Sequence, residues 1–183
     1  MTLEFIVPLI FMTLVMVAAS VLTFGILAPV TMAGYMHSIL LMVRDRREPK
    51  VQDVFSQMKL FFPLLGFGLV VFIAICIGLI LLLLPGIIIS VGVAYFCMYM
   101  IPLMTDKNMG VVEAIKASYS MTTNKDKIQE HAVVLIIFIA VTGIGSSTFI
   151  GWLFTLPLAT IFLISVYLEE VKEMSSYSDL MQK

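Results

Sequence analysis

The sequence predicts an all-α integral membrane protein with six transmembrane helices in three hairpins and two cytoplasmic interfacial amphipathic helices. Of its 183 residues, 61% are hydrophobic and only 13% are charged, and the mean hydropathy is +1.08. Soluble domains are usually about 45–50% apolar and about 25% charged. The apolar residues form runs close to the roughly 20 residues that a membrane-crossing helix needs. All Lys and Arg residues lie between or after these runs.

The hydrophobic runs place the six spans within a single transmembrane domain, residues 1–168. We expect the spans at about residues 3–27, 28–43, 61–84, 86–104, 130–145 and 148–168. The second span is short, because Arg44 stops it abruptly. We favour a full crossing for this segment, with a re-entrant half-helix as the alternative.

The basic residues predict the orientation of these spans. They fall into three segments, residues 44–59, 107–127 and 172–183, whereas the connections near Pro29 and Pro85 carry no charge. With six spans all three basic segments lie on one side, which the positive-inside rule makes cytoplasmic. The chain is therefore expected in the cell (inner) membrane, crossing it several times, with both termini in the cytoplasm.

Two cytoplasmic segments have the apolar periodicity of an amphipathic helix. In residues 49–59 the apolar positions Val51, Val54, Phe55 and Met58 recur at helical spacing, and residues 109–122 show a similar stripe. We expect each helix to lie along the membrane interface. Residues 169–183 are expected to form a polar, frayed C-terminal tail.

The sequence contains few groups with chemistry at membrane depth. An ionisable residue there is costly and is a functional candidate for that reason. His37 is the main one, with Tyr35 and Ser38 beside it in a candidate polar membrane site. The alternatives are a proton-sensitive or ligand-binding imidazole in a cavity and a neutral histidine bonded to another helix. We expect no catalytic residue, cofactor or metal, because no nucleophile has a base beside it in sequence and no metal-binding motif is present.

Small residues recur every four positions in two of the spans. Such stripes let helix backbones approach closely, which drives association in lipid. They serve either packing within the chain or a contact between subunits. The predicted packing and assembly residues are Gly86, Ser90 and Ala94 in the fourth span, and Ser147, Gly151, Thr155 and Ala159 in the sixth.

The first basic segment predicts contact with anionic lipid headgroups. Clustered cations beside a membrane span are attracted to such headgroups, and the residues expected to make this contact are Arg44, Arg46, Arg47 and Lys50. The net charge of the whole chain is only −1, which gives no reason to expect nucleic-acid binding. Cys76 and Cys97 are expected as two free thiols, with one bridge between spans as the alternative.

Several short motifs resemble a group of uncharacterised prokaryotic membrane proteins that includes the membrane domain of some glycerophosphodiester phosphodiesterases. They are residues 25–29 (GILAP), Gly34-Tyr35, Asp53-Val54-Phe55, residues 84–87 (LPGI), residues 113–118 (EAIKAS), and Pro157 before Tyr167. The resemblance covers nearly the whole chain and implies a six-helix membrane fold. It implies no catalytic residues.

These observations favour a non-enzymatic membrane protein that acts by assembling, either with itself or as an accessory subunit with a partner, to form a scaffold or a permeation path. Its expected partners are membrane lipids and a second copy of the chain or another membrane protein. The alternative is a carrier or channel for a small or lipophilic solute, with His37 and Tyr35 near its path. A lipid-modifying membrane enzyme is the third reading.

Overall fold

The computed structural model describes residues 6–81, 83–124, 127–146 and 149–181, and these residues are almost entirely helical, without a β-strand. Two 3₁₀ segments, η2 and η3, precede α3. The elements in chain order are α1 (Ile6–Leu22), α2 (Ala28–Asp45), η2 (Val51–Phe55), η3 (Met58–Leu60), α3 (Phe61–Leu81), α4 (Leu83–Phe96), α5 (Met100–Asp106), α6 (Val111–Thr122), α7 (Ile128–Ser146) and α8 (Phe149–Met181).

Four helical stretches are long and apolar enough to cross a membrane. They are Val51–Leu79, Pro85–Asp106, Ile128–Gly145 and Gly151–Ser175. These stretches contain α3, α4 with α5, α7 and most of α8. The expected first and second spans correspond to α1, a shorter apolar helix, and to α2, and neither is among the four.

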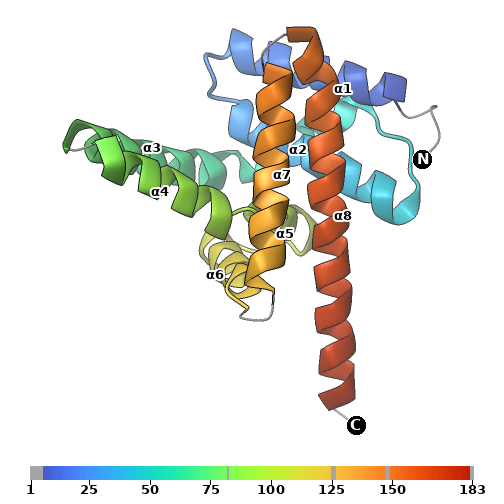
Figure 1. Cartoon of the computed structure of the whole chain (residues 1–183). Coiled ribbons are helices and arrows are strands. Elements are labelled where there is room, and N and C mark those ends of the chain that lie inside the picture. The colour runs from blue at the N-terminus through green and yellow to red at the C-terminus, as the bar shows by residue number, and fades with distance from the viewer. Residues whose placement is uncertain (1–5, 82, 125–126, 147–148, 182–183) are drawn as a thin grey trace.

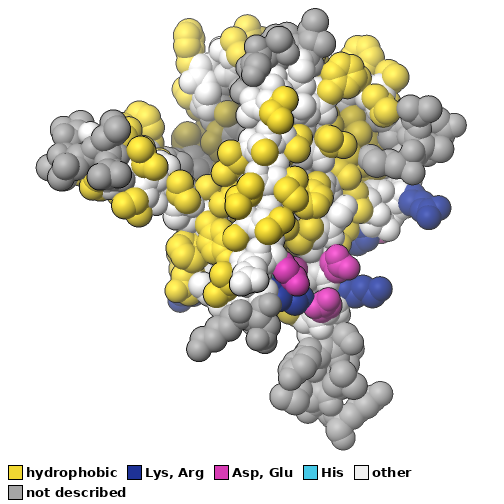
Figure 2. Space-filling model, in the orientation of Figure 1, with side chains coloured by type: hydrophobic (Ala, Val, Ile, Leu, Met, Phe, Trp, Pro, Cys, Tyr) yellow, Lys and Arg dark blue, Asp and Glu magenta, His cyan; other side chains and the backbone are white. Residues whose placement is uncertain are grey.

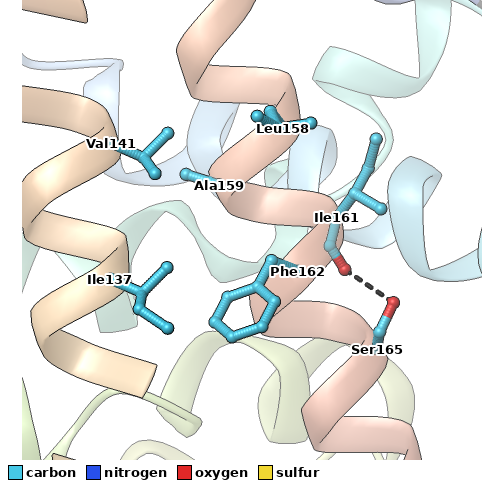
Figure 3. A pocket seen from close by; sticks show the side chains of 7 residues that line it. All are labelled: Ile137, Val141, Leu158, Ala159, Ile161, Phe162 and Ser165. Atoms are coloured by element: carbon cyan, nitrogen blue, oxygen red, sulfur yellow. Dashed lines mark hydrogen bonds between the residues drawn. The ribbon is translucent and has the colours of Figure 1, made fainter. Parts of the chain in front are cut away.

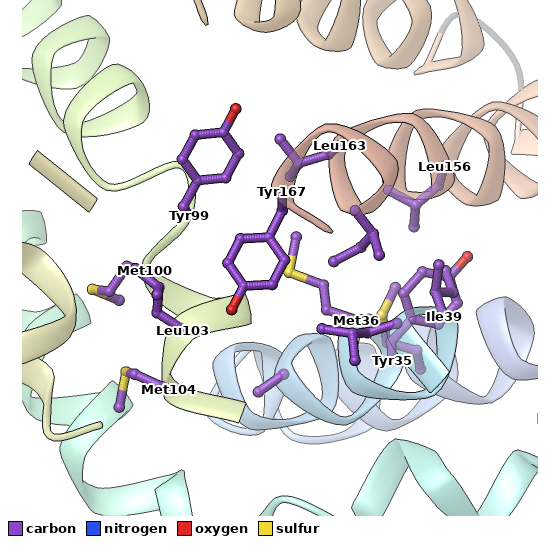
Figure 4. Close-up of a cluster of buried hydrophobic side chains, with 14 of the residues drawn as sticks. Tyr35, Met36, Ile39, Tyr99, Met100, Leu103, Met104, Leu156, Leu163 and Tyr167 are labelled. Atoms are coloured by element: carbon purple, nitrogen blue, oxygen red, sulfur yellow. The ribbon is translucent and has the colours of Figure 1, made fainter. Parts of the chain in front are cut away.

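Helix α2 lies at the centre of the folded body. It packs against α1, α5 and α8, and its Tyr35, Ile39 and Leu40 are fully buried. Figure 4 shows part of this core, where α2 side chains meet Leu103 of α5 and Leu163 of α8. The hydroxyl residues Thr31 and Ser38 of α2 are also buried, whereas Arg44 and Asp45 at its end are exposed.

The turn between α1 and α2 requires an unusual backbone. Phe24 and Gly25 have positive φ angles of 51° and 84°, a region that glycine enters without steric cost. Pro29 then occupies the first turn of α2, where its fixed φ suits a helix start and its missing N–H is not needed. The turn sends α2 back along α1, and the two helices pack together.

Helices α3 and α4 form a hairpin that we call the arm (residues 61–96). Figure 1 shows the arm projecting sideways from the body, across the direction of α7 and α8. Its two helices pack on each other, α3 also contacts α2, η3 and α6, and α4 contacts α6 and α7. Only 6% of the residues in the apolar window of α3 are buried, against 28% for the window that contains α4 and 39% for α8. Much of the apolar surface of α3 is therefore not covered by the body, whereas α4 is attached to it.

Helices α7 and α8 form the second apolar hairpin and stand side by side in Figure 1. Helix α8 runs from Phe149 to Met181, so most of the expected tail, residues 169–183, belongs to this helix. The expectation of a frayed tail was wrong for these residues. Hydrogen bonds from Lys127 to Glu170 and Glu173 support the helix beyond its apolar part.

The segment at residues 49–59 differs from its prediction. It forms the two short 3₁₀ segments and not one α-helix, and only Val54 of its four apolar stripe residues is buried. The cause is the close approach of η2 to Gly34 of α2, where a Cβ atom would lie 2.2 Å from the Val54 carbonyl oxygen. The backbone of this segment therefore packs onto α2, and its larger apolar side chains remain exposed.

The second amphipathic segment forms a helix close to the expected residues, α6. Its buried residues are Ala114, Ser118, Met121 and Thr122. Of the predicted apolar stripe (Val111, Val112, Ile115, Tyr119 and Thr122), Thr122 is buried, whereas Val112 and Tyr119 are exposed. The prediction from the apolar stripe was therefore wrong about which face of α6 is buried. The small residues face inward because α6 packs closely on α4 and α5.

Candidate functional site

The charged segments of the chain contact one another. Arg44 at the end of α2 forms an ion pair with Asp106 at the end of α5, and Lys59 donates a hydrogen bond to Asn108. Lys127 before α7 forms ion pairs with Glu170 and Glu173 of α8. Figure 2 shows charged side chains gathered below the apolar face of the molecule. This grouping supports the inference that the basic segments share one side of a membrane.

Asp106 is the centre of this charged end. Its carboxylate is only 4% exposed and accepts hydrogen bonds from Arg44 and from the Tyr167 hydroxyl, the latter at 3.1 Å. The Lys107 ammonium lies 3.8 Å from the same carboxylate. The hydrogen bond with Asp106 raises the pKa of Arg44. Through Asp106, α5 is joined to both α2 and α8.

Asp53 is a second carboxylate centre, in η2. Its oxygens accept hydrogen bonds from Arg47 at 2.8 and 3.0 Å, from the Ser38 hydroxyl at 2.8 Å and from the Lys50 amide at 3.2 Å. These bonds hold η2 against α2, where Gly34 allows the backbones to touch. Charge-assisted hydrogen bonds of this kind are about twice as strong as neutral ones.

The three residues of the predicted polar membrane site face different partners. The Tyr35 hydroxyl lies 3.1 Å from the Thr13 hydroxyl of α1, and Ser38 is bonded to Asp53. His37 is half-buried among the charges of Asp106, Arg44, Asp53 and Lys59, and its Nδ1 atom is buried without a partner among the described residues. The structure therefore does not bring the three side chains into one pocket.

A buried cluster of His131 and two tyrosines was not predicted from the sequence. His131 is fully buried, and its Nδ1 atom is hydrogen-bonded to the Tyr99 hydroxyl at 3.1 Å. The Tyr99 ring packs near that of Tyr167, with centroids 6.1 Å apart. The signal available in the sequence was weak: His131 stands three residues before the buried Val134, one helical turn along the same face.

Ser118 joins this cluster to the break between α4 and α5. Its hydroxyl donates to the Phe96 carbonyl at 2.7 Å and accepts from the Tyr99 amide at 3.2 Å. A helix end leaves backbone groups without intrahelical partners, and buried groups of this kind need other partners. The Ser118 hydroxyl therefore provides a hydrogen-bond partner for one backbone group on each side of the break, the Phe96 carbonyl and the Tyr99 amide.

We expect Tyr99→Phe to lower the free energy of unfolding by about 1–2 kcal/mol, because it leaves His131 Nδ1 buried without its partner. Thermal unfolding of the purified chain in detergent measures the change. Tyr119→Phe is the matched control, since Tyr119 is 52% exposed. Equal melting temperatures for the two variants would contradict the buried hydrogen bond.

The four basic residues expected at lipid headgroups are held in different ways. Arg44 and Arg47 form ion pairs with Asp106 and Asp53. Arg46 is exposed and caps α2 with a left-handed backbone, φ 54°. Lys50 is exposed beside η2. Two of the four charges are therefore partly neutralised within the chain.

The small-residue stripes take part in packing within the hairpins. A Cβ atom at Gly86 would lie 2.6 Å from the Leu79 side chain of α3, and one at Gly145 would lie 1.7 Å from the Thr155 hydroxyl oxygen of α8. Ser90 bonds the Gly86 carbonyl of its own helix. Of the other stripe residues, Ala94 is exposed, Gly151 is half-buried, Ala159 is buried, and Ser147 lies outside the described residues.

The contacts at this end of the molecule join segments of one chain to each other. Within the described ranges no group of three or more His, Cys, Asp or Glu side chains has the arrangement of a metal site. Cys76 and Cys97 are free thiols. Among the described residues, the ion pairs and hydrogen bonds of the charged end join α2, α5 and α8 to one another and Lys127 to α8.

Comparison with known proteins leaves the family open. No family model, no curated protein and no solved structure matches the chain. The resemblance to the phosphodiesterase-associated membrane group therefore remains a prediction from the motifs.

Proposed function

We propose that this chain is a non-enzymatic, multi-pass protein of the cell membrane that acts by assembling with a second copy of itself through the arm. The observation that carries the proposal is the arm itself, an apolar hairpin in which much of the surface of α3 is not covered by the rest of the chain. Two of the four helical stretches that are suited to cross a membrane contribute to this projecting hairpin. Such a hairpin is suited to contact another membrane component. Another membrane protein in place of the second copy is an outcome that the experiment distinguishes.

The proposed topology has six spans with both termini in the cytoplasm, and it requires the arm to turn from its crosswise direction in Figure 1 toward that of α7 and α8. Contacts among the charged segments support it, because Arg44, Asp106 and the base of α8 meet at one end. At 17 residues, α1 has a length of about 26 Å, close to the roughly 30 Å of hydrocarbon in a bilayer. In this proposal α6 and the 3₁₀ segments lie at the cytoplasmic interface.

The faces of the arm carry glycines that favour close contact between helices. A Cβ atom at Gly66, Gly68 or Gly92 would meet no atom within 4 Å. Lipid surrounds apolar side chains as well as protein does, so helix association in a bilayer depends on close packing at small residues. These three open positions support the arm as the assembling surface.

Assembly is tested by substituting arm glycines with a bulky residue. We expect Gly66→Leu and Gly92→Leu to weaken dimers in lipid nanodiscs about tenfold, equivalent to about 1.4 kcal/mol, because the added side chains separate the helices. Single-molecule photobleaching at increasing lipid dilution measures the dimer fraction. Gly143→Leu is the matched control, because a Cβ atom at Gly143 of α7 also meets nothing within 4 Å.

A second measurement locates the contact. Cys76 lies in α3 and Cys97 directly follows α4. In bilayers a bismaleimide should cross-link the Cys97→Ala variant, which keeps Cys76, more than the Cys76→Ala variant. A wild-type chain that stays monomeric at high density, or a dimer unchanged by both arm substitutions, overturns the proposal. A stoichiometric second membrane protein that protects Cys76 in cells would assign the arm to a partner.

No contact among the described residues favours the alternative of a carrier with His37 and Tyr35 beside its path. Tyr35 is fully buried against Thr13, and His37 faces the charged end. That the chain is not an enzyme is also part of this proposal.

A further inference from the structure

Helices α7 and α8 leave a groove between them, with a volume of about 390 Å³. Figure 3 shows its wall, formed by Ile137 and Val141 of α7 and by Leu158, Ala159, Phe162 and Ser165 of α8. The volume is within the roughly 300–1,000 Å³ that is common for small-molecule sites. From Leu158 to Ser165 the groove follows α8 for about 10 Å.

The chemistry of the wall selects an apolar occupant. Ser165 supplies the polar side chain among the lining residues, and its hydroxyl already donates to the Ile161 carbonyl at 2.8 Å. No lining side chain offers another hydrogen-bond donor. The groove therefore offers van der Waals contact, which a hydrocarbon chain can use and a polar ligand cannot.

The position of the groove indicates where this hydrocarbon chain comes from. Its residues belong to two of the four stretches that are suited to cross a membrane, Ile128–Gly145 and Gly151–Ser175. An acyl chain of a membrane lipid is narrow enough to enter the groove and is already present at this depth.

Charged residues at one end of the groove favour one kind of headgroup. Glu169 and Lys172 lie one and two helical turns beyond Ser165 and are exposed, as is Glu130 of α7. Lys127 is paired with Glu170 and Glu173 there, so among the described residues of this end four glutamates accompany two lysines. Figure 2 shows acidic and basic side chains directly below the apolar α7–α8 face. The acidic excess attracts a cationic group, and Lys172 suits a phosphate.

We propose that this groove binds a zwitterionic phospholipid. One acyl chain lies between α7 and α8, the headgroup ammonium lies near Glu169 and Glu130, and the phosphate lies near Lys172. The site differs in its charge from the first basic segment, residues 44–59, where the sequence predicts contact with anionic lipid. The inference requires α7 and α8 to lie in a bilayer, and it does not depend on assembly through the arm.

The test uses the full chain in nanodiscs of equal parts phosphatidylethanolamine and phosphatidylglycerol, followed by native mass spectrometry of the retained lipid. We expect one retained phosphatidylethanolamine. Val141→Phe fills the groove from α7 and should reduce retention about fivefold, or by about 1 kcal/mol. Ser165→Trp fills it from an exposed position, so it keeps the test valid if Val141→Phe unfolds. Val21→Phe, on the exposed surface of α1, is the matched control.

The headgroup is tested separately with Glu130→Gln and Glu169→Gln combined, which should shift the retained lipid toward phosphatidylglycerol. Retention unchanged by both groove-filling variants overturns the site. A wild-type preference for phosphatidylglycerol that the glutamine variant does not alter overturns the headgroup assignment. Flotation of each variant with vesicles shows whether it is in the membrane, which separates loss of the lipid from failed insertion.

Discussion

Replacing Asp106 with Asn should lower the free energy of unfolding by about 2–4 kcal/mol, because it removes the charge from a side chain that is only 4% exposed and accepts two hydrogen bonds, each worth about 1.5–3 kcal/mol to a charged group. The substitution keeps the shape of the side chain and removes the charge that Arg44 and Tyr167 contact. At about 2–4 °C per kcal/mol for a domain of this size, the melting temperature should fall by roughly 5–15 °C. A fluorescence-monitored thermal ramp in detergent measures it.

Asp45→Asn is the control for this experiment. Asp45 also contacts Arg44, at 3.5 Å, but its side chain is 53% exposed. An exposed ion pair contributes at most about 1 kcal/mol. A double-mutant cycle with Arg44→Ala then isolates the coupling between Arg44 and Asp106. Equal effects of the Asp106 and Asp45 substitutions would show that Asp106 does not hold α2, α5 and α8 together.

Replacing Gly34 with Ala is the second change for which we expect a large effect, a loss of at least about 2 kcal/mol from overpacking. The new Cβ atom would lie 2.2 Å from the Val54 carbonyl oxygen and 2.5 Å from that of Asp53. Both are backbone atoms, so relief requires η2 to move away from α2 and stretches the Asp53 hydrogen bonds. Thermal unfolding reports the stability loss, and faster protease cleavage within residues 46–58 reports the displaced segment.

Gly66→Ala should instead raise the free energy of unfolding. Gly66 lies inside α3 with open space beside it. Alanine there gains up to about 1 kcal/mol of helix propensity without a clash. If Gly34→Ala were as stable as Gly66→Ala, the close contact between α2 and η2 would be wrong.

Much of the helical layout could be predicted from hydropathy. The runs at residues 61–84, 86–104, 130–145 and 148–168 correspond to apolar helices suited to a membrane. The signal is strong because a membrane helix must satisfy its backbone internally over a long apolar run. The 3₁₀ form of residues 49–59 could not be predicted in this way, because it depends on a tertiary contact with Gly34.

The ion pair of Arg44 with Asp106 and the hydrogen bond between Tyr99 and His131 could not be predicted either, for a related reason. Arg44 and Asp106 are 62 positions apart, and Tyr99 and His131 are 32 apart. Local periodicity does not report such distant pairs. Tyr35, His37 and Ser38 are adjacent in sequence, but α2 points them toward different neighbours, so closeness in the chain suggested a site that the helix separates.

The uncharged hairpins have a consequence for biogenesis. No Asp, Glu, Lys or Arg occurs in residues 60–105 or in residues 132–168, turns included. Translocating a charged group through hydrocarbon costs several kcal/mol, and a charge in a translocated turn would add that barrier. Each of these helical pairs can therefore enter the bilayer as one unit while its flanking ionic residues stay on the side of synthesis. We expect insertion to depend little on the transmembrane voltage.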